Sequence, residues 1–197
     1  MREKKKGVYQ KYLKNLLDRL LALVGTAALS WLLLGVGIAV RLDSPGPVLF
    51  RQKRVGRNGQ YFYIYKFRTM RIDTPHDMPT HLLNHPDFFI TRVGRFLRKT
   101  SLDELPQLFN ILKGDISIVG PRPVMEVETE IYGNYRDMLL SVKPGLTGFW
   151  AANGRSCTTY TRRRAMEICY IKNRSVCFDL KIILKTITSV FKGEGAV

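Results

Sequence analysis

An apolar run near the N-terminus constrains the fold of this chain more than any other feature of its sequence. Leu20 to Val40 contains no charged residue and is mostly apolar. As a helix it would be about 32 Å long, close to the thickness of the hydrocarbon core of a bilayer. A signal peptide would have a shorter apolar region and a small-residue cleavage site, and no convincing site is present. The run therefore predicts a membrane-inserted helix.

Basic residues flank this run on both sides. They are Arg2, Lys4, Lys5, Lys6, Lys11, Lys14 and Arg19 before it, and Arg41, Arg51, Lys53, Arg54, Arg57, Lys66, Arg68 and Arg71 after it. Because Lys and Arg accumulate on the cytoplasmic side of membranes, a single span would leave one basic flank on the wrong side. A helix that enters and returns to the same face satisfies both flanks. The possible bending points are Gly25, Thr26, Ser30, Gly35 and Gly37. At this point re-entry and a single span are equally open.

Composition places the rest of the chain among folded, basic domains. The chain has 197 residues, of which 45% are hydrophobic, and a formal net charge of +16. Such a length suggests one domain, and the charge implies an anionic partner: nucleic acid, an anionic leaflet or a phosphorylated substrate. Cys157, Cys169 and Cys177 form no Cys-x-x-Cys pair, which favours reduced thiols over a disulfide or zinc framework. The three histidines (His76, His81 and His85) share one polar stretch, which favours a surface loop over a metal site.

The pattern of residues predicts a mixed α/β fold that is predominantly helical. Aromatic and β-branched runs at 48–54 and 61–67 around a Gly-Arg-Asn-Gly turn predict a small β-hairpin. Residues 71–91 lack periodicity and are expected to form a loop. Helices are expected at 93–99, 102–112, 124–142, 160–173 and 178–192. The last helix is amphipathic, so it could pack on the core, which is the default, or lie in the membrane interface.

Ser101-Leu102-Asp103-Glu104 is the most informative local sequence for chemistry. One interpretation is a capping box, in which Ser101 caps a helix and Glu104 reaches back to it. The same geometry also suits function, because a helix start favours anions and would keep the Asp103 carboxylate ionised. Pro106 is too deep for an ideal first turn and should distort the helix near the acids.

Several basic residues surround this acidic pair along the chain. They are Arg92, Arg95, Arg98, Lys99, Lys113 and Arg122. A solvated surface explains most of them. Arg122 is the exception, because Pro121 and Pro123 make its backbone stiff, and guanidinium groups suit bidentate recognition of phosphate.

The ordered motifs of the chain resemble those of a known family. The segments that carry the resemblance are Tyr65-Lys66-Phe67-Arg68-Thr69-Met70, Ser101-Leu102-Asp103-Glu104-Leu105-Pro106-Gln107-Leu108-Phe109-Asn110, Leu112-Lys113-Gly114-Asp115-Ile116-Ser117-Ile118-Val119-Gly120-Pro121-Arg122-Pro123, Lys143-Pro144-Gly145-Leu146-Thr147-Gly148 and Tyr170-Ile171-Lys172-Asn173. Together they resemble the bacterial sugar transferases, the monotopic phosphoglycosyl transferases, in their small single-domain form. The resemblance covers nearly the whole chain.

The resemblance implies an activity with assigned residues. A phosphosugar would pass from a nucleotide-diphosphate sugar, usually a uridine (UDP) one, to undecaprenyl phosphate in a ping-pong reaction. Asp103 matches the family nucleophile, and Glu104 matches the second acid and is our choice for the Mg²⁺ ligand. Arg98 and Arg122 match basic positions that would hold phosphate, and we add Lys66 and Arg68 as further phosphate-binding candidates.

It also implies a location on the bacterial inner membrane. Residues 1–43 would form a basic N-terminus with a re-entrant helix, and residues 44–197 a catalytic domain facing the cytoplasm. Two departures from the family pattern stand out. Relatives commonly break the helix at Ser-Pro, whereas Ser30 here precedes Trp31, so the break could rest on Ser30 and the nearby glycines, or the helix could span. Glu167 stands where relatives often carry Asp, which would alter either a helix contact or the fit of the sugar.

Three other functions compete with this interpretation. A membrane-tethered nucleic-acid-binding protein would use the basic charge. However, the sequence contains no nucleic-acid-binding motif, and we expect no nucleic acid as a partner. A catalytically silent scaffold would not need the Asp103-Glu104 pair. An enzyme that transfers the sugar without its phosphate would release a nucleoside diphosphate instead of a monophosphate. The sequence does not predict the sugar, the pathway or the oligomeric state.

Overall fold

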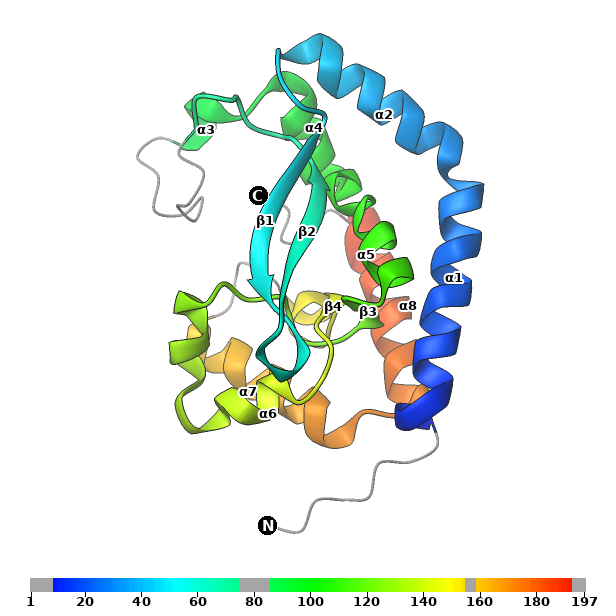
Figure 1. Cartoon of the computed structure of the whole chain (residues 1–197), viewed down its shortest axis with the longest axis vertical. Helices are drawn as coiled ribbons and strands as arrows, with labels where there is room; N and C mark the ends of the chain where they lie inside the picture. The colour runs from blue at the N-terminus through cyan, green and yellow to red at the C-terminus, as the bar shows by residue number, and fades with distance from the viewer. Residues whose placement is uncertain (1–8, 75–85, 155–158, 193–197) are drawn as a thin grey trace.

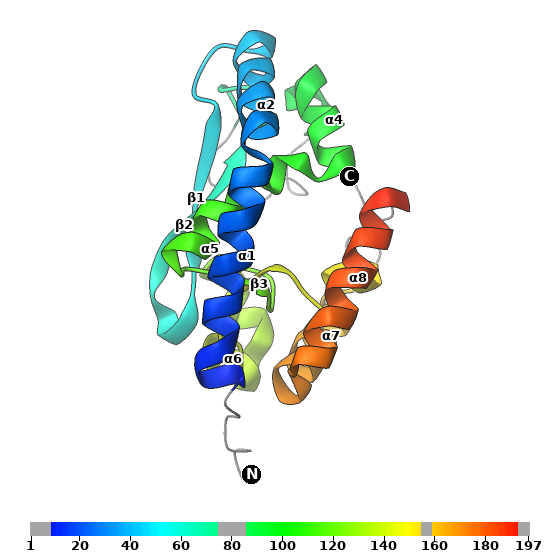
Figure 2. The same cartoon turned by 90° about the vertical axis from the view of Figure 1, so that its right-hand side faces the viewer.

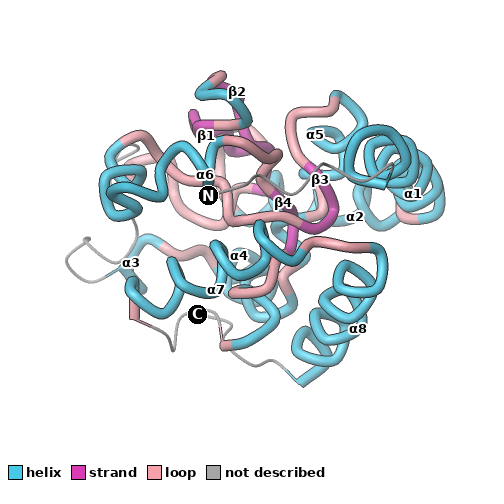
Figure 3. The backbone as a smooth tube through the Cα atoms, turned by 90° about the horizontal axis from the view of Figure 1, so that it is seen from below, coloured by secondary structure: helices cyan, strands magenta, loops and turns pink. Residues whose placement is uncertain are grey.

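The computed structural model describes residues 9–74, 86–154 and 159–192, and its fold is mixed α/β and mostly helical, as predicted (Figure 1). Seen from below, the β-hairpin lies at one side, helices α7 and α8 lie at the other, and a short parallel strand pair lies between them (Figure 3). The three histidines and Cys157 are outside the described residues, whereas Cys169 and Cys177 are free and exposed.

The apolar run forms two helices with a sharp bend between them. A π-helical turn, Tyr9–Leu13, leads into α1 (Lys14–Ala28), and α2 (Ser30–Asp43) follows at an angle of 64°. Close to the bend, the Ser30 hydroxyl donates to the Ala27 carbonyl at 2.9 Å, and the Thr26 hydroxyl donates to the Ala22 carbonyl at 2.7 Å. Such back-bonding bends helices, so this break needs no proline. Among the described residues, no single helix is long and apolar enough to cross a membrane; α1 and α2 meet that criterion only as a bent pair.

Both halves of this bent segment pack on the rest of the chain. Ala22 of α1 lies in a buried cluster with Phe62, Ile64, Ile111 and Ile116. On α2, two buried valines share a second cluster, formed by Val36, Val40, Phe67 and Leu97. The buried Asp18 carboxylate also ties α1 to the domain, because it accepts hydrogen bonds from the Ser117 hydroxyl at 2.5 Å and the Ile118 N–H at 3.3 Å.

The predicted hairpin is confirmed. Strand β1 (Leu49–Val55) pairs antiparallel with β2 (Tyr61–Phe67), with Leu49 opposite Phe67 and Val55 opposite Tyr61. The connecting turn, Arg57–Gly59, needs two consecutive residues with positive φ, which Asn58 (57°) and Gly59 (76°) supply. Asn and Gly are the residues that adopt this conformation most readily.

Between residues 86 and 113, the structure confirms one predicted helix, corrects another and adds a short helix where a loop was expected. A short helix, α3 (Pro86–Phe89), lies within the region expected to be a loop, and α4 (Arg92–Thr100) confirms the basic helix. The helix expected at 102–112 is wrong in its first half, where residues 102–104 form a 3-10 turn, η4 (Leu102–Glu104). Helix α5 (Gln107–Lys113) begins only after Pro106, because proline has no N–H to continue a helix from the preceding turn.

The helix expected at 124–142 is also wrong. Val124 instead forms a bridge with Val55, and the following residues form a 3-10 segment, η5 (Val127–Tyr135), before the short helix α6 (Arg136–Leu140). Gly133 interrupts η5 with a φ of 48° and a ψ of −127°, outside any helical conformation. A glycine with positive φ so near the middle of the segment stops a continuous α-helix.

A parallel strand pair holds the proline-rich loops in place. Strand β3 (Ser117–Val119) lies beside β4 (Gly145–Thr147). Just beyond β3, the Gly120 N–H donates to the Thr147 carbonyl at 2.9 Å. A Cβ on Gly120 would lie 2.7 Å from the Gly145 nitrogen, so the close approach of the two chains requires glycine.

The C-terminal helices agree with the sequence prediction. After a 3-10 turn, Ala151–Asn153, helix α7 (Tyr160–Asn173) has the predicted bounds, and α8 (Val176–Lys192) begins two residues earlier than expected. Ile182 of α8 is buried in a third hydrophobic cluster, which it shares with Val119, Leu139 and Ile168, and this confirms that one side of α8 packs on the core. Further apolar side chains of α8 remain exposed: Val176, Leu180, Leu184 and Ile187.

Candidate active site

The acidic pair lies on the tight turn between α4 and α5. Ser101 ends α4 in the left-handed conformation, with a φ of 58°, and its side chain makes no capping hydrogen bond to the turn that follows. The predicted capping box is therefore wrong. Asp103 is buried, with 9% of its surface exposed, whereas Glu104 is partly exposed. The turn thus places one carboxylate inward and the other toward solvent.

Two predicted basic residues meet the acidic pair from distant parts of the chain. Lys66, near the end of β2, places its Nζ 2.6 Å from Glu104 Oε1 and 4.0 Å from Asp103 Oδ2. Arg98 of α4 donates from Nε to the Thr69 hydroxyl at 2.9 Å, and its charge lowers the pKa of Asp103. We call Lys66, Arg98, Asp103 and Glu104 the acidic site.

Burial sets the proton affinity of Asp103. Burial, with a smaller contribution from the charge of Glu104, raises the pKa of this carboxyl to about 6, although Lys66 and Arg98 oppose the increase. This corrects the expectation that a helix start would favour the ionised form, because the residues around Asp103 are a 3-10 turn and α5 begins four residues later. Near neutral pH the carboxylate nevertheless predominates, and a carboxylate with a raised pKa is typical of functional sites.

Arg68 has a different environment from Lys66. Its side chain is buried, and its two terminal nitrogens donate to the carbonyls of Pro45 at 2.5 Å and Ser44 at 2.8 Å. These bonds fix the loop that joins α2 to the hairpin. A phosphate-binding role for Arg68 stays a prediction, and the structure adds a structural role for this residue.

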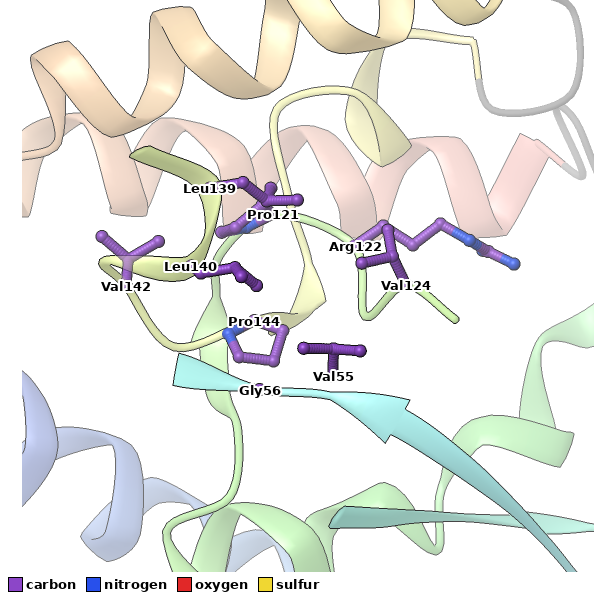
Figure 4. A pocket seen from close by; sticks show the side chains of 9 residues that line it. All are labelled: Val55, Gly56, Pro121, Arg122, Val124, Leu139, Leu140, Val142 and Pro144. Atoms are coloured by element: carbon purple, nitrogen blue, oxygen red, sulfur yellow. The ribbon is translucent and has the colours of Figure 1, made fainter. Parts of the chain in front are cut away.

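Arg122 projects from a loop that is packed against a small cavity. The cavity is lined by Val55, Gly56, Pro121, Arg122, Val124, Leu139, Leu140, Val142 and Pro144. Figure 4 shows that the Arg122 side chain extends away from Leu139 and Val142, and its guanidinium is exposed to solvent. That guanidinium lies 5.5 Å from the ring centre of Trp150, within the range of a cation–π contact.

A cluster of charged residues that the sequence did not reveal surrounds this loop. We call Arg54, Arg122, Arg163, Glu128 and Glu167, together with Trp150, the arginine cluster. Arg54 pairs with Glu128 at 3.0 Å, and Arg163 lies 3.6 Å from Glu128 and 3.5 Å from Glu167. The sequence singled out Arg122 and Glu167 individually, and the spacing of Arg163 and Glu167 places these two on one face of a helix. Their connection to Arg54 and Glu128 depends on the tertiary fold.

The acidic site and the arginine cluster share one face of the hairpin. Side chains alternate along a strand, so Arg54 and Gln52 of β1 point to the same side as Ile64 and Lys66 of β2. The Arg54 and Lys66 rungs are four residues apart in the ladder, or roughly 13 Å at the usual rise of a strand. The hairpin thus connects a carboxylate site at one end with a cationic site at the other.

Comparison with known proteins identifies the family. Residues 9–193 match the model of the family described as bacterial sugar transferase. The undecaprenyl-phosphate galactose phosphotransferase of Salmonella typhimurium is 39% identical over 200 residues, covering 94% of this chain and 42% of that protein. The UDP-glucose:undecaprenyl-phosphate glucose-1-phosphate transferase of Xanthomonas campestris pv. campestris is 40% identical over 191 residues, covering 93% of this chain and 40% of that protein. The exopolysaccharide production protein ExoY of Sinorhizobium fredii is 39% identical over 197 residues, covering 93% of this chain and 87% of that protein.

The chain therefore spans less than half the length of the first two relatives and most of the length of the third. The match extends from the bent N-terminal helices through the acidic site and the arginine cluster to α8. The chain belongs to the bacterial sugar transferase family.

Proposed function

We propose that this protein transfers a phosphosugar from a UDP-sugar to undecaprenyl phosphate, through a covalent intermediate on Asp103, as the first step in assembling a glycoconjugate or polysaccharide. One observation carries the proposal: a buried carboxylate with a raised pKa lies beside Lys66 and Arg98 on a tight turn. The names of the Salmonella and Xanthomonas relatives describe transfer of galactose or glucose-1-phosphate to undecaprenyl phosphate, which supports the same reaction class.

In the first step the ionised Asp103 attacks the sugar-linked phosphorus of the donor. A bond forms between a carboxylate oxygen and phosphorus, and the phosphoanhydride bond breaks, so uridine monophosphate (UMP) leaves with the electron pair. Lys66 and Arg98 stabilise the negative charge around the phosphorus. In the second step a phosphate oxygen of undecaprenyl phosphate attacks the same phosphorus and releases the Asp103 carboxylate. This covalent route divides one difficult displacement into two.

The acidic site fits the Mg²⁺ that the resemblance implies. Mg²⁺ is usually held by one or two carboxylates together with substrate phosphates, and the two adjacent acids provide such a set. We propose Glu104 as the protein ligand, since it is the more exposed acid of the pair. Its Oε1 lies 2.6 Å from Lys66 Nζ. The bound ion would neutralise charge on the donor diphosphate.

We propose further that α1 and α2 form a re-entrant membrane segment rather than a span. Both helices pack on the same domain, through Ala22 on one and Val36 on the other, so they cannot lie on opposite sides of a bilayer. Their outward side chains are apolar and exposed, among them Leu17, Leu20, Leu21, Val24, Trp31, Leu34, Ile38 and Leu42. Figure 2 shows α1, α2 and α8 on one face of the molecule, so the exposed apolar stripe of α8 adds to the lipid-facing side. The basic flanks support an orientation in which the domain lies on the cytoplasmic face of the inner membrane.

The enzymatic proposal is tested by product analysis. Purified protein in nanodiscs would receive undecaprenyl phosphate, Mg²⁺ and a panel of UDP-sugars, and the released nucleotide would be identified. We expect UMP from wild-type protein, and a loss on the order of 10⁴-fold or more in Asp103→Asn. Asp137→Asn, an exposed acid on α6, should retain full activity. Release of uridine diphosphate instead of UMP would mean transfer of the sugar alone, and wild-type rates in Asp103→Asn would exclude the covalent aspartate.

A further inference from the structure

Each residue of the loop that carries Arg122, from Gly120 to Pro123, has one backbone group in a hydrogen bond. Gly120 N–H and Pro121 carbonyl bond to the chain around β4, at 2.9 and 2.8 Å. The Arg122 N–H donates to Glu167 Oε1 at 3.1 Å, and the Pro123 carbonyl accepts from the Arg54 guanidinium at 3.3 Å. Arg122 itself is exposed, whereas the prolines on either side of it are buried, so its guanidinium faces solvent. A loop so strongly fixed presents one cationic group in a defined place.

Glu167 is the centre of this scaffold. It is 1% exposed, and Oε1 both accepts the Arg122 N–H and lies 3.5 Å from Arg163 Nε. Its second oxygen, Oε2, accepts the Tyr132 hydroxyl. Burial raises the pKa of Glu167, and the charge of Arg163 opposes that increase. One carboxylate therefore joins α7, η5 and the Arg122 loop, and its reach from α7 depends on the length of a glutamate side chain.

The arginine cluster also carries more positive than negative charge. Three guanidinium groups face two carboxylates. Within the described residues, Arg54 Nε and Arg163 Nε and Nη2 are buried and make no hydrogen bond, although Arg163 Nε lies 3.5 Å from Glu167 Oε1. Burial and the nearby charge of Arg122 together lower the pKa of Arg54 to about 10. Crowding like charges in a buried site is costly. An anion at the exposed Arg122 would offset that cost.

From these observations we infer that Glu167 is a positioning residue, which holds Arg122 so that its guanidinium binds a phosphate of the donor nucleotide. The inference rests on the proposed function and adds a residue to it. Arg122 lies on the cationic end of the hairpin face whose other end carries Lys66 and the acidic site. Two substrates carry a phosphate that Arg122 could bind, the UDP-sugar and undecaprenyl phosphate. We assign the phosphate bound by Arg122 to the UDP-sugar.

The test compares Glu167→Asp with a neighbouring control on the same helix. Asp keeps the charge but shortens the side chain, so the carboxylate no longer reaches the Arg122 N–H. We expect Glu167→Asp to raise KM for the UDP-sugar about tenfold while kcat changes less than twofold, because ground-state and transition-state binding are lost equally. Arg164→Gln removes a bond from α7 to the Ile131 carbonyl but touches neither Glu167 nor Arg122, and it should leave KM unchanged. Glu167→Gln, which keeps an oxygen at the right length, should restore part of the affinity.

Equilibrium dialysis of UMP alone provides a readout that needs no turnover. We expect Glu167→Asp and Arg122→Met each to weaken UMP binding about tenfold, and the double variant to be no weaker than Arg122→Met, because Glu167 acts through Arg122. A Glu167→Asp protein that melts earlier but binds UMP with wild-type affinity would overturn the inference, since that is the result of a purely structural role. A rise in KM for undecaprenyl phosphate instead of the UDP-sugar would overturn the assignment to the nucleotide. Absence of turnover by wild-type protein would contradict the proposed function. The dialysis would still test the role of Glu167, because UMP binding does not require turnover.

Discussion

The acidic site and the arginine cluster use the same kinds of side chain, yet the pKa of Asp103 in the first is raised and that of Glu128 in the second is lowered. In the acidic site, burial raises the pKa of Asp103 to about 6, against the opposing charges of Lys66 and Arg98. In the arginine cluster, burial acts on Glu128 in the same direction, but the Met125 N–H, Arg54 and Arg163 outweigh it and lower the pKa of this group. The direct donors to Glu128 account for the difference between these two groups, whereas the deeper burial of Glu167 keeps its pKa raised despite its donors.

This contrast separates a reactive carboxylate from structural ones. Lys66 Nζ lies 4.0 Å from Asp103, whereas Glu128 accepts bonds from Arg54 at 3.0 Å and from the Met125 N–H at 2.8 Å. A carboxylate with few donors keeps its lone pairs available, as a nucleophile requires, at a cost in stability. A carboxylate with several donors is held in place and can hold its neighbours. We therefore expect substitutions in the two sites to change stability in opposite directions.

The largest effect on stability is expected at Arg163. Arg163→Met should lower the free energy of unfolding by about 3 to 5 kcal/mol, because Glu128 and Glu167 would both lose a buried counter-charge. Denaturant unfolding of the detergent-solubilised protein would measure this loss. Arg164, at the next position of α7, is only partly buried and forms no buried ion pair within the described part of the chain, so Arg164→Gln should cost less than about 1 kcal/mol. A loss below about 1 kcal/mol in Arg163→Met would show that the cluster does not stabilise the fold.

At Asp103, in contrast, substitution is expected to increase the free energy of unfolding. Its pKa is higher in the folded chain, at about 6, than the ordinary value of 3.8, so folding disfavours the charged form. The resulting penalty is fully present above pH 6 and disappears as the pH falls below 4. Asp103→Asn should therefore raise the free energy of unfolding by about 1 to 3 kcal/mol at pH 8 and by almost nothing at pH 4. Parallel unfolding curves at the two pH values test this, and a destabilised Asp103→Asn at pH 8 would contradict it.

Sequence reasoning predicted local features well where a single residue type decides the backbone. The hairpin was predicted because Asn58 and Gly59 adopt positive φ, and the bounds of α7 followed from its pattern. It failed at Ser101, where a capping pattern is overridden by the left-handed end of α4, and over residues 124–142, where pairing of Val124 with Val55 displaces a helix. Both failures depend on contacts with distant residues, which periodicity does not report.

The same distinction applies to the candidate site: individual residues could be predicted from the sequence, but contacts between distant residues could not. Sequence reasoning named Asp103, Glu104, Lys66 and Arg98, and the fold brings these four together. It also named Arg122, but not the residues that hold it. Arg54 and Arg163 come from separate elements and look like ordinary surface cations in the sequence, yet they meet through Glu128, which only the folded chain reveals.

The smallest expected effect is the fall of kcat/KM at acidic pH, which most directly probes the reactive carboxylate. Because only ionised Asp103 can attack, kcat/KM for the UDP-sugar should fall about tenfold between pH 7 and pH 5, with a midpoint near 6. Lys66 favours the ionised form, so Lys66→Met should move that midpoint to higher pH in addition to lowering the maximum rate. Arg163→Met, which alters the other site, should leave the midpoint where it is. A midpoint that stays fixed in Lys66→Met would assign the acid limb to a different group, and the contrast between the two sites would then lie in their packing and not in the proton affinity of Asp103.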